Sequence, residues 1–385
     1  MADTRHDEHG RGIDRSAESE RNAVPRTVII APDSFKGSLS AAEAAEAIAE
    51  GWRGVRPQDA LILMPQADGG EGTLDAIEAS VPGAVRHEVG TVTGPDGRPT
   101  PGAWLELPGN VAVVELAQPS GLPLMATPDA MAATTRGLGE VIGHALDSGA
   151  RSLVIGLGGS ASTDAASGAL MALGLRLTDS HGQPIADGGR ALASVASIDR
   201  SGLAVPDSVT LLTDVDAPLL GKHGASAIFG PQKGATAAQV TELDAALAHF
   251  AELFGGDHTA AGAGAAGGAG WGFATAWGAT IMSGADYIAD LGGLTNAIRS
   301  ADLLLTGEGR FDSQSLGGKV VGQLLGTATN AGVPVGVIAG QVSIETELWT
   351  SSLTELAGSA QAAMGDPAHW LTQAGARAAR ELVGV

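Results

Sequence analysis

The sequence predicts an α/β protein with mainly parallel sheets, one section of mixed strands and two domains. Short apolar runs repeatedly end in Gly, Asp, Glu or a hydroxyl residue and are followed by a segment of helical character. This alternation is typical of parallel sheets whose faces are covered by helices. The length of 385 residues also exceeds the size at which a single core usually stops growing, which favours two domains.

The first two strand and helix pairs lie near the N-terminus. Thr27–Ala31 and Leu61–Met64 are apolar runs that predict buried strands. Ser40–Glu43 has the form of a capping box and begins a predicted helix that reaches about Trp52. A second helix is predicted from Leu74 to about Ala79. A proline and then polar residues follow both strands.

The parallel pattern is interrupted between His87 and Glu115. Short segments separated by Gly and Pro predict hairpin strands there, including Ala103–Leu107 and Val111–Leu116. Apolar residues at helical spacing between 138 and 146 then predict a helix that leads into a strand at 153–155.

Three more strands are predicted in the second half of the chain. They are Val209–Leu212, Leu303–Leu305 and Val335–Ala339, with a helix from about Ala237 to Phe254 between the first two. Open α/β sheets bind ligands at the carboxyl ends of their strands, so we expect the functional site at that edge.

The composition argues against several classes of function. A formal charge of −21 disfavours binding of nucleic acid and of anionic membranes. The absence of cysteine excludes disulfides and thiol catalysis. Residues 1–23 lack an apolar run and are predicted to be a disordered tail, and the Gly/Ala-rich stretch Ala260–Ala285 is a poor membrane span. We therefore expect a cytoplasmic protein; its oligomeric state is left open.

The stretch Leu153–Asp164 is the centre of the functional interpretation. An apolar run breaks into a glycine loop and then into hydroxyl residues, and such a turn presents backbone N–H groups to an anion, with phosphate as the first choice. The pattern Gly156-x-Gly158-x-x-Ala161, with Asp179 as a ribose-binding acid, also fits an NAD(P)-dependent hydroxy-acid dehydrogenase. That alternative leaves the other glycine and acid loops without a role.

Every lysine of the chain adjoins a glycine. They are Lys36, Lys222, Lys233 and Lys319. Compact ammonium groups in tight glycine loops suit the phosphates of a nucleotide or a small carboxylate substrate. Turns also favour both glycine and solvated lysine, so a structural explanation competes for each of them.

A series of acids follows the predicted strands. They are Asp33, Asp68, Glu71, Asp164, Asp214, Asp216, Glu308 and Asp312. Phosphoryl transfer uses carboxylates to hold Mg²⁺ and a base to orient the attacking hydroxyl, although some of these acids would instead cap helices. The Walker A motif and the protein-kinase signatures are absent, so a kinase here would be of another type.

Five segments, taken together and in order, carry a specific resemblance. They are Ala31–Ser38 (APDSFKGS), Ala67–Thr73 (ADGGEGT), Gly156–Asp164 (GLGGSASTD), Phe229–Gly234 (FGPQKG) and Thr306–Asp312 (TGEGRFD). The chain resembles the bacterial glycerate kinase family from about Thr27 to Gly340. The departures are Ala165 and Ala166, where Gly-Gly is common, and Thr163, where Asn is frequent.

The resemblance implies transfer of the γ-phosphate of ATP to D-glycerate with Mg²⁺, usually at C2 to give 2-phosphoglycerate and ADP. The sequence leaves open transfer at C3 and a related hydroxy acid as substrate. The resemblance also implies two α/β domains, one inserted in the other, with the active site in the cleft between them. We expect an outer domain of residues 24–80 and 285–385 and an inserted domain of residues 81–284.

The residues and the resemblance together suggest four groups of site residues. Catalysis is assigned to Asp33, Lys36, Asp68 and Glu71. Substrate binding is assigned to Ser34, Gly69, Gly70, Gly72 and Arg310. ATP binding is assigned to Gly158, Gly159, Ser160, Ser162, Thr163, Lys233 and Lys319. Binding of Mg²⁺ is assigned to Asp164, Asp214, Asp216, Glu308 and Asp312.

Overall fold

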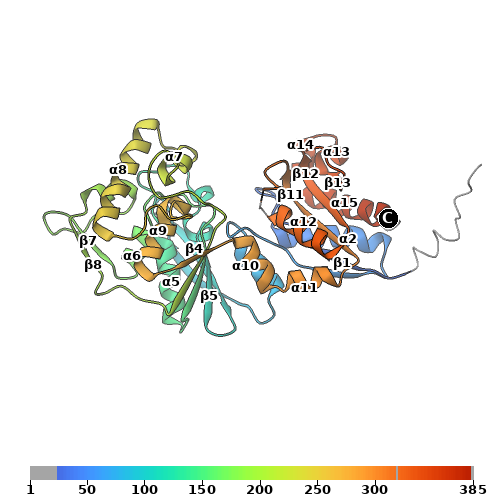
Figure 1. Cartoon of the computed structure of the whole chain (residues 1–385), viewed down its shortest axis with the longest axis horizontal. Helices are drawn as coiled ribbons and strands as arrows, with labels where there is room; N and C mark the ends of the chain where they lie inside the picture. The colour runs from blue at the N-terminus through green and yellow to red at the C-terminus, as the bar shows by residue number, and fades with distance from the viewer. Residues whose placement is uncertain (1–23, 318–319, 383–385) are drawn as a thin grey trace, which may run out of the picture.

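The structure is a computed structural model that describes residues 24–317 and 320–382 of the chain. Figure 1 shows two lobes. We call them the terminal lobe, which is built on a five-stranded sheet from both ends of the chain, and the central lobe, which is built on a six-stranded sheet from the middle. The predicted α/β class with parallel and mixed sheets is confirmed, whereas the predicted tail at 1–23 lies outside the described residues.

The sheet of the terminal lobe is parallel and has the order β13-β12-β11-β1-β2. Its strands are β1 (Thr27–Ile30), β2 (Ala60–Leu63), β11 (Leu303–Phe311), β12 (Val335–Val342) and β13 (Trp349–Ser352). Its helices are α2 (Ala41–Val55), α11 (Leu294–Arg299), α12 (Val320–Ala331), α13 (Leu353–Ala357), α14 (Ala360–Gly365) and α15 (Pro367–Glu381).

Successive side chains of β1 contribute to the cores on both faces of this sheet. Val28 and Ile30 belong to the core that includes α2 and α15, whereas Ile29 belongs to the core that includes α11 and α12. Successive side chains of a strand point to opposite faces, so a short run of large aliphatic residues supplies two cores. All three side chains are fully buried.

The sheet of the central lobe has the order β10-β9-β6-β5-β4-β3. Its strands are β3 (Val85–Thr93), β4 (Pro99–Leu107), β5 (Val111–Glu115), β6 (Ser152–Gly156), β9 (Ser208–Leu212) and β10 (Thr280–Met282). The pairs β3 with β4 and β4 with β5 are antiparallel, as the hairpin signals predict, and the remaining pairs are parallel. A separate antiparallel pair is formed by β7 (Arg176–Thr178) and β8 (Ser197–Asp199).

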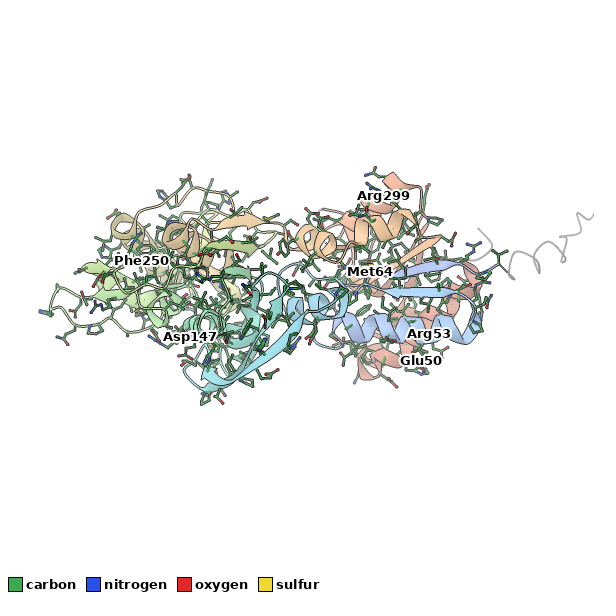
Figure 2. All side chains as sticks on the ribbon, turned by 90° about the horizontal axis from the view of Figure 1, so that it is seen from below. Glu50, Arg53, Met64, Asp147, Phe250 and Arg299 are labelled. Carbon is green, nitrogen blue, oxygen red and sulfur yellow. The ribbon has the colours of Figure 1, made fainter. Side chains whose placement is uncertain are left out.

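The helices of the central lobe lie on both faces of its sheet. They are α3 (Thr73–Ser80), α4 (Ala117–Ser120), α5 (Arg136–Asp147), α6 (Ser167–Ala172), α7 (Ala225–Phe229), α8 (Ala237–Phe254), α9 (Ala265–Trp277) and α10 (Gly284–Leu291), with short 3₁₀ turns η1 (Leu122–Leu124), η2 (Gly189–Ser194) and η3 (Pro231–Lys233). Phe250 of α8, labelled in Figure 2, packs its ring 5.1 Å from Phe254 and 5.5 Å from Trp271, centroid to centroid.

Helix α3 belongs with the central lobe in its packing. Leu74 and Ile77 share a buried cluster with Leu105 of β4 and Val113 of β5, and Ile288 of α10 lies in the same cluster. The predicted boundaries at residues 80 and 285 would assign α3 and all but the first residue of α10 to the outer domain. We propose instead that the boundaries lie before α3 and after α10.

Local signals locate several elements closely. Helix α2 begins with the predicted capping box, in which Ser40 and Glu43 each accept a hydrogen bond from the other's backbone N–H. Helix α8 spans the predicted range and has a second capping box between Thr236 and Gln239. Within the described residues, no helix is long and apolar enough to cross a membrane.

Candidate active site

A cavity of about 960 Å³ is lined by residues from both lobes. The predicted site residues in its lining are Ser34, Lys36, Asp68, Gly70, Glu71, Gly72, Gly158, Gly159, Ser160 and Lys233. They come from the loops after β1, β2 and β6 and from η3, so segments that are far apart in the sequence meet at one place. The carboxyl ends of parallel strands therefore form the site, as expected for open α/β sheets.

The loop after β1 holds Asp33 against the neighbouring strand. Its backbone N–H donates to the carbonyl oxygen of Gly307 at 2.8 Å, which extends the pairing of β1 with β11. The Asp33 Oδ1 accepts a hydrogen bond from the backbone N–H of Ser34 at 2.6 Å. Phe35 is buried and anchors the loop, whereas the Lys36 side chain is exposed at the cavity.

Asp33 lies in an acidic environment that favours its neutral form. Burial raises the pKa of Asp33 to about 7, and repulsion by Asp68 and then by Glu308 adds to this rise. The Ser34 N–H and the Lys36 ammonium oppose it. A carboxyl group with a pKa near neutral pH is suited to general base catalysis.

The loop after β2 is packed tightly on the central lobe. The Gly158 N–H donates to the Gly69 carbonyl oxygen at 3.0 Å, and a Cβ atom placed on Gly158 would lie 2.4 Å from the Gly70 Cα. Gly69 has a φ of 88°, and a Cβ there would lie 2.8 Å from the carbonyl oxygen of Leu212. Close backbone approach therefore requires these glycines. Gly158 and Gly70 line the cavity, whereas Gly69 lies outside the lining.

Asp68 organises the same loop from within. Its Oδ1 accepts a hydrogen bond from the Gly70 N–H at 3.0 Å, and the Thr73 hydroxyl donates to the Gly70 carbonyl oxygen at 2.7 Å. The loop is thus held at both ends, which leaves the exposed Glu71 side chain beside the cavity.

Glu115, the last residue of β5, also lines the cavity. The backbone N–H groups of Gly72 and Leu74 donate to its Oε1 and Oε2, each at 3.1 Å. Burial raises the pKa of Glu115 to about 7; the two N–H groups lower it, and Asp75 and Glu71 raise it further. The sequence analysis missed this residue, although an acid at the end of a predicted strand is the signal that identified the others.

The glycine loop after β6 is tied to η3 by a buried lysine. Lys233 is 2% exposed, and its Nζ donates to the Ser160 Oγ at 2.8 Å and to the Ser162 carbonyl oxygen. Burial lowers the pKa of Lys233 to about 7, against the opposing effect of Asp164. An ammonium has three donors, and these two contacts use two of them.

The second half of the predicted nucleotide loop turns away from the cavity. Ser162, Thr163 and Asp164 are fully buried and lie outside the lining. The Asp164 Oδ2 accepts hydrogen bonds from the backbone N–H and hydroxyl of Thr135 and from the Gly168 N–H, at 2.9, 2.8 and 3.2 Å. Burial raises the pKa of this carboxyl, and we leave Asp164 out of the metal-binding set proposed below.

The other predicted metal ligands also lie outside the lining. Asp214 and Asp216 are exposed, Glu308 is partly buried, and Asp312 pairs with Arg310 at 3.3 Å. In the described part of the chain, no three His, Asp or Glu side chains are grouped so that they could hold a metal ion. The Asp312 Oδ1 accepts the Gln314 N–H, which makes a local turn.

The structure corrects the dinucleotide interpretation. Asp179 follows β7, which pairs with β8 outside the six-stranded sheet, and its Oδ1 accepts the N–H groups of His181 and Gln183 in an exposed turn. A ribose-binding acid must instead end the strand next to the glycine loop. Asp179 is therefore a turn residue.

The remaining lysines differ in their placement. Lys222 is exposed and lies outside the lining, whereas Lys319 falls outside the described residues. Arg86 of β3 is a lining residue that sequence reasoning missed, and its guanidinium pairs with Asp75 at 2.6 Å and Glu78 at 2.8 Å. No sequence motif marks Arg86, because its partners come from a different element.

Known proteins resemble this chain over most of its length. A family model described as "Glycerate kinase family" matches residues 28–383. A glycerate kinase of Bacillus subtilis (strain 168) is 44% identical over 330 residues, which cover 82% of this chain and 85% of the relative. A glycerate 2-kinase of Escherichia coli (strain K12) is 43% identical over 327 residues, with 82% and 85% covered.

A solved structure has the same fold. The crystal structure of a glycerate kinase 2 from Salmonella typhimurium LT2 superposes with a TM-score of 0.79 at 37% identity. The match covers 94% of this chain and 99% of that chain.

Proposed function

The chain belongs to the glycerate kinase family, and we propose that it transfers the γ-phosphate of ATP to the C2 hydroxyl of D-glycerate, giving 2-phosphoglycerate and ADP. The observation that carries the proposal is the convergence of three strand-end loops and Lys233 on one cavity. Its volume of about 960 Å³ is at the upper end of the usual range of ~300–1,000 Å³ for ligand pockets. A nucleotide and a three-carbon acid both need room in it.

We propose that the loops after β1 and β2 bind glycerate. Ser34, Lys36 and Asp68 line this part of the cavity. The exposed Lys36 ammonium suits a substrate carboxylate, and the oxygens of Ser34 and Asp68 suit the two hydroxyls. Discrimination among small hydroxy acids would then depend on these three side chains.

Asp33 is the proposed general base. Its pKa of about 7 makes it ionised in a large fraction of molecules at neutral pH while it remains basic enough to accept a proton. In the proposed reaction the C2 hydroxyl gives its proton to Asp33 as the oxygen attacks the γ-phosphate.

The glycine loop and Lys233 are the proposed phosphate contacts. Gly158, Gly159 and Ser160 line the cavity, and Lys233 places a cation beside them. Phosphoryl transfer spreads negative charge over the transferred group, so the protein contributes mainly by positioning and by stabilising that charge.

Two acids that interact with Asp33 or Asp68 are the proposed partners of a divalent cation. Glu308 raises the pKa of Asp33, and partial burial of the carboxyl group, followed by repulsion from Asp68, raises the pKa of Asp214. Mg²⁺ usually takes one or two carboxylates together with substrate phosphates, so Glu308 and Asp214 are the proposed ligands. When bound, Mg²⁺ would neutralise charge on the phosphates.

The reaction is tested by ³¹P NMR of a mixture of the protein, ATP, MgCl₂ and D-glycerate. Transfer to C2 places the phosphate on a carbon with one hydrogen and gives a doublet, whereas transfer to C3 gives a triplet. A parallel sample without glycerate controls for ATP hydrolysis. Absence of any phosphorylated acid, with ATP unchanged, would overturn the proposal, and a triplet would overturn its regiochemistry.

A further inference from the structure

Glu115 supplies the N-terminal cap of α3 from a different strand. The residue at the N-cap position is Gly72, which has a φ of 88° and no side chain of its own. Both oxygens of Glu115 are used, since one accepts the Gly72 N–H and the other accepts the Leu74 N–H. The first N–H groups of a helix otherwise lack partners, and a carboxylate is their strongest acceptor.

This contact determines where a substrate anion is able to bind. The positive end of a helix next to a cavity is a common site for phosphate or carboxylate. Here the protein's own carboxylate, 5% exposed, already occupies the N–H groups of Gly72 and Leu74. Because Glu115 already accepts these hydrogen bonds, the N–H groups at the start of α3 hold the loop in place and do not bind a substrate anion.

The loop that Glu115 holds is the one with the proposed substrate contacts. Gly72 directly follows Glu71 and comes four residues after Asp68, and all three line the cavity together with Glu115. The other end of the loop rests on the central lobe through the hydrogen bond from the Gly158 N–H to Gly69. Loss of the Glu115 contact would loosen the end that carries Glu71, where the Thr73 hydroxyl would still donate to Gly70.

We propose that Glu115 is a positioning residue that fixes the Asp68–Gly72 loop in the conformation that binds the hydroxy-acid substrate. This inference rests on the proposed function only for the identity of the substrate. The positioning itself is a statement about Glu115 and the loop, and it is measurable without substrate.

The test compares Glu115→Gln with Glu140→Gln. Glutamine keeps the size of the side chain but presents an NH₂ group to one of the two backbone donors, so one hydrogen bond is lost. Glu140 of α5 is a matched control, because it accepts the Thr93 N–H at 2.7 Å and the Thr93 hydroxyl at 2.8 Å and lies outside the cavity lining.

Two readouts separate positioning from stability. Without substrate, hydrogen exchange of the amides in the segment 69–75 should accelerate in Glu115→Gln and remain unchanged in Glu140→Gln. In kinetics, the KM for D-glycerate should rise about ten- to a hundredfold in Glu115→Gln, the range expected for loss of a hydrogen bond to a charged group. The KM for ATP should stay within about twofold.

Unchanged exchange in the segment 69–75 would overturn the proposal, whether or not the protein proves to be a glycerate kinase. Equal rises in both KM values would also overturn it, because general loosening would affect both substrates. If Glu115→Gln does not fold, Glu115→Asp provides the same comparison, since it retains the charge but withdraws the carboxylate by one methylene. If exchange is faster in Glu115→Gln but the wild-type protein has no glycerate kinase activity, only the proposed function is contradicted.

Discussion

The ammonium of Lys233 lies 2.8 Å from the hydroxyl of Ser160 and joins η3 to the glycine loop after β6, 73 residues earlier in the chain. The same ammonium donates to the Ser162 carbonyl oxygen, so it both fixes the loop and places a positive charge at the cavity. A buried ammonium loses hydration, and its retention in this position is consistent with a role towards an anionic ligand.

Lys233→Met should reduce kcat about 10²–10³-fold, by analogy with the loss of one donor from an oxyanion site. Methionine fills the space of the stem but has no ammonium for the phosphates or for Ser160. Steady-state turnover with ATP and D-glycerate measures the effect. Lys222→Met is the control, because Lys222 also adjoins a glycine but is exposed outside the lining. Equal effects of the two substitutions would contradict the assignment.

Wild type and Lys233→Met should also differ in stability, by an amount that depends on pH. The pKa of Lys233 falls from 10.5 to about 7 on burial, so between these pH values the unfolded chain binds more protons than the folded protein. The contribution of Lys233 to the free energy of unfolding therefore rises with pH across this interval and is constant below it. Urea unfolding at pH 7 and pH 9.5 should show wild type gaining stability relative to Lys233→Met at the higher pH. A pH-independent difference would show that the lysine titrates normally.

Local sequence signals predicted those elements whose stabilising contacts lie within one turn. The capping box at Ser40 and Glu43 is an example, and both residues of the contact can be identified in the sequence. Glu115 is the opposite case, because its two partners lie 43 and 41 residues earlier. The hairpin of β4 and β5 brings Glu115 close to these two backbone N–H groups. No local sequence pattern predicts such a contact.

The direction in which a loop side chain points is also difficult to predict from the sequence. Ser160 and Asp164 are four residues apart in one polar stretch, yet Ser160 lines the cavity and Asp164 turns inward to Thr135. Immediately after Asp164, Ala165 and Ala166 have positive φ values, which are rare for alanine and hard to anticipate from the sequence. The motif therefore predicted the location of the site but not which of its residues face the ligand.

Asp33→Asn should lower kcat about 10²–10⁴-fold, the usual contribution of a general base. In the wild type, kcat/KM should fall as the pH decreases below about 7, because protonation removes the base. This acid limb should be absent from the residual activity of the variant. Asp302→Asn is the control, since Asp302 also accepts a backbone N–H, from Thr27 at 2.8 Å, but is exposed and lies at the amino end of β11. An unchanged acid limb in Asp33→Asn would assign the titration to another group.

The same substitution should stabilise the protein at alkaline pH. The pKa of Asp33 is raised from 3.8 to about 7, so between these values the folded protein holds more protons than the unfolded chain. The contribution of Asp33 to stability is therefore full below about pH 4 and is lost as the pH rises to 7. Asparagine carries no such penalty, and the melting temperature of Asp33→Asn should exceed that of wild type more at pH 8 than at pH 4.5. The reverse order would contradict the burial of a charged group here.

Lys36→Ala should reduce turnover of D-glycerate, because the exposed ammonium at the cavity is the proposed partner of the substrate carboxylate. A charged hydrogen bond contributes about 1.5–3 kcal/mol, so kcat/KM for D-glycerate should fall about 10–100-fold. Initial rates at varied D-glycerate and saturating ATP measure this change, with Lys222→Ala as the control. Kinetics that match the wild type would remove Lys36 from the site.

Ala165→Gly and Ala166→Gly should be tolerated far better than buried alanine to glycine changes usually are. Both residues are fully buried with φ values of 52° and 60°, a region that costs an L-residue ~1–2 kcal/mol. Glycine removes that strain but loses ~0.5–1 kcal/mol in chain entropy and ~0.8 kcal/mol for the buried methyl group. The terms nearly cancel, and each variant should remain within about 1 kcal/mol of wild type.

Ala169→Gly is the matched control for this prediction, because Ala169 is fully buried in the neighbouring helix α6. It has no positive φ to relieve, so the entropy and methyl terms add to a loss of about 2 kcal/mol. Free energies of unfolding from urea titrations of the three variants measure the contrast. Equal losses at all three positions would show that the left-handed alanines are unstrained, and the bend after the glycine loop would then need another explanation.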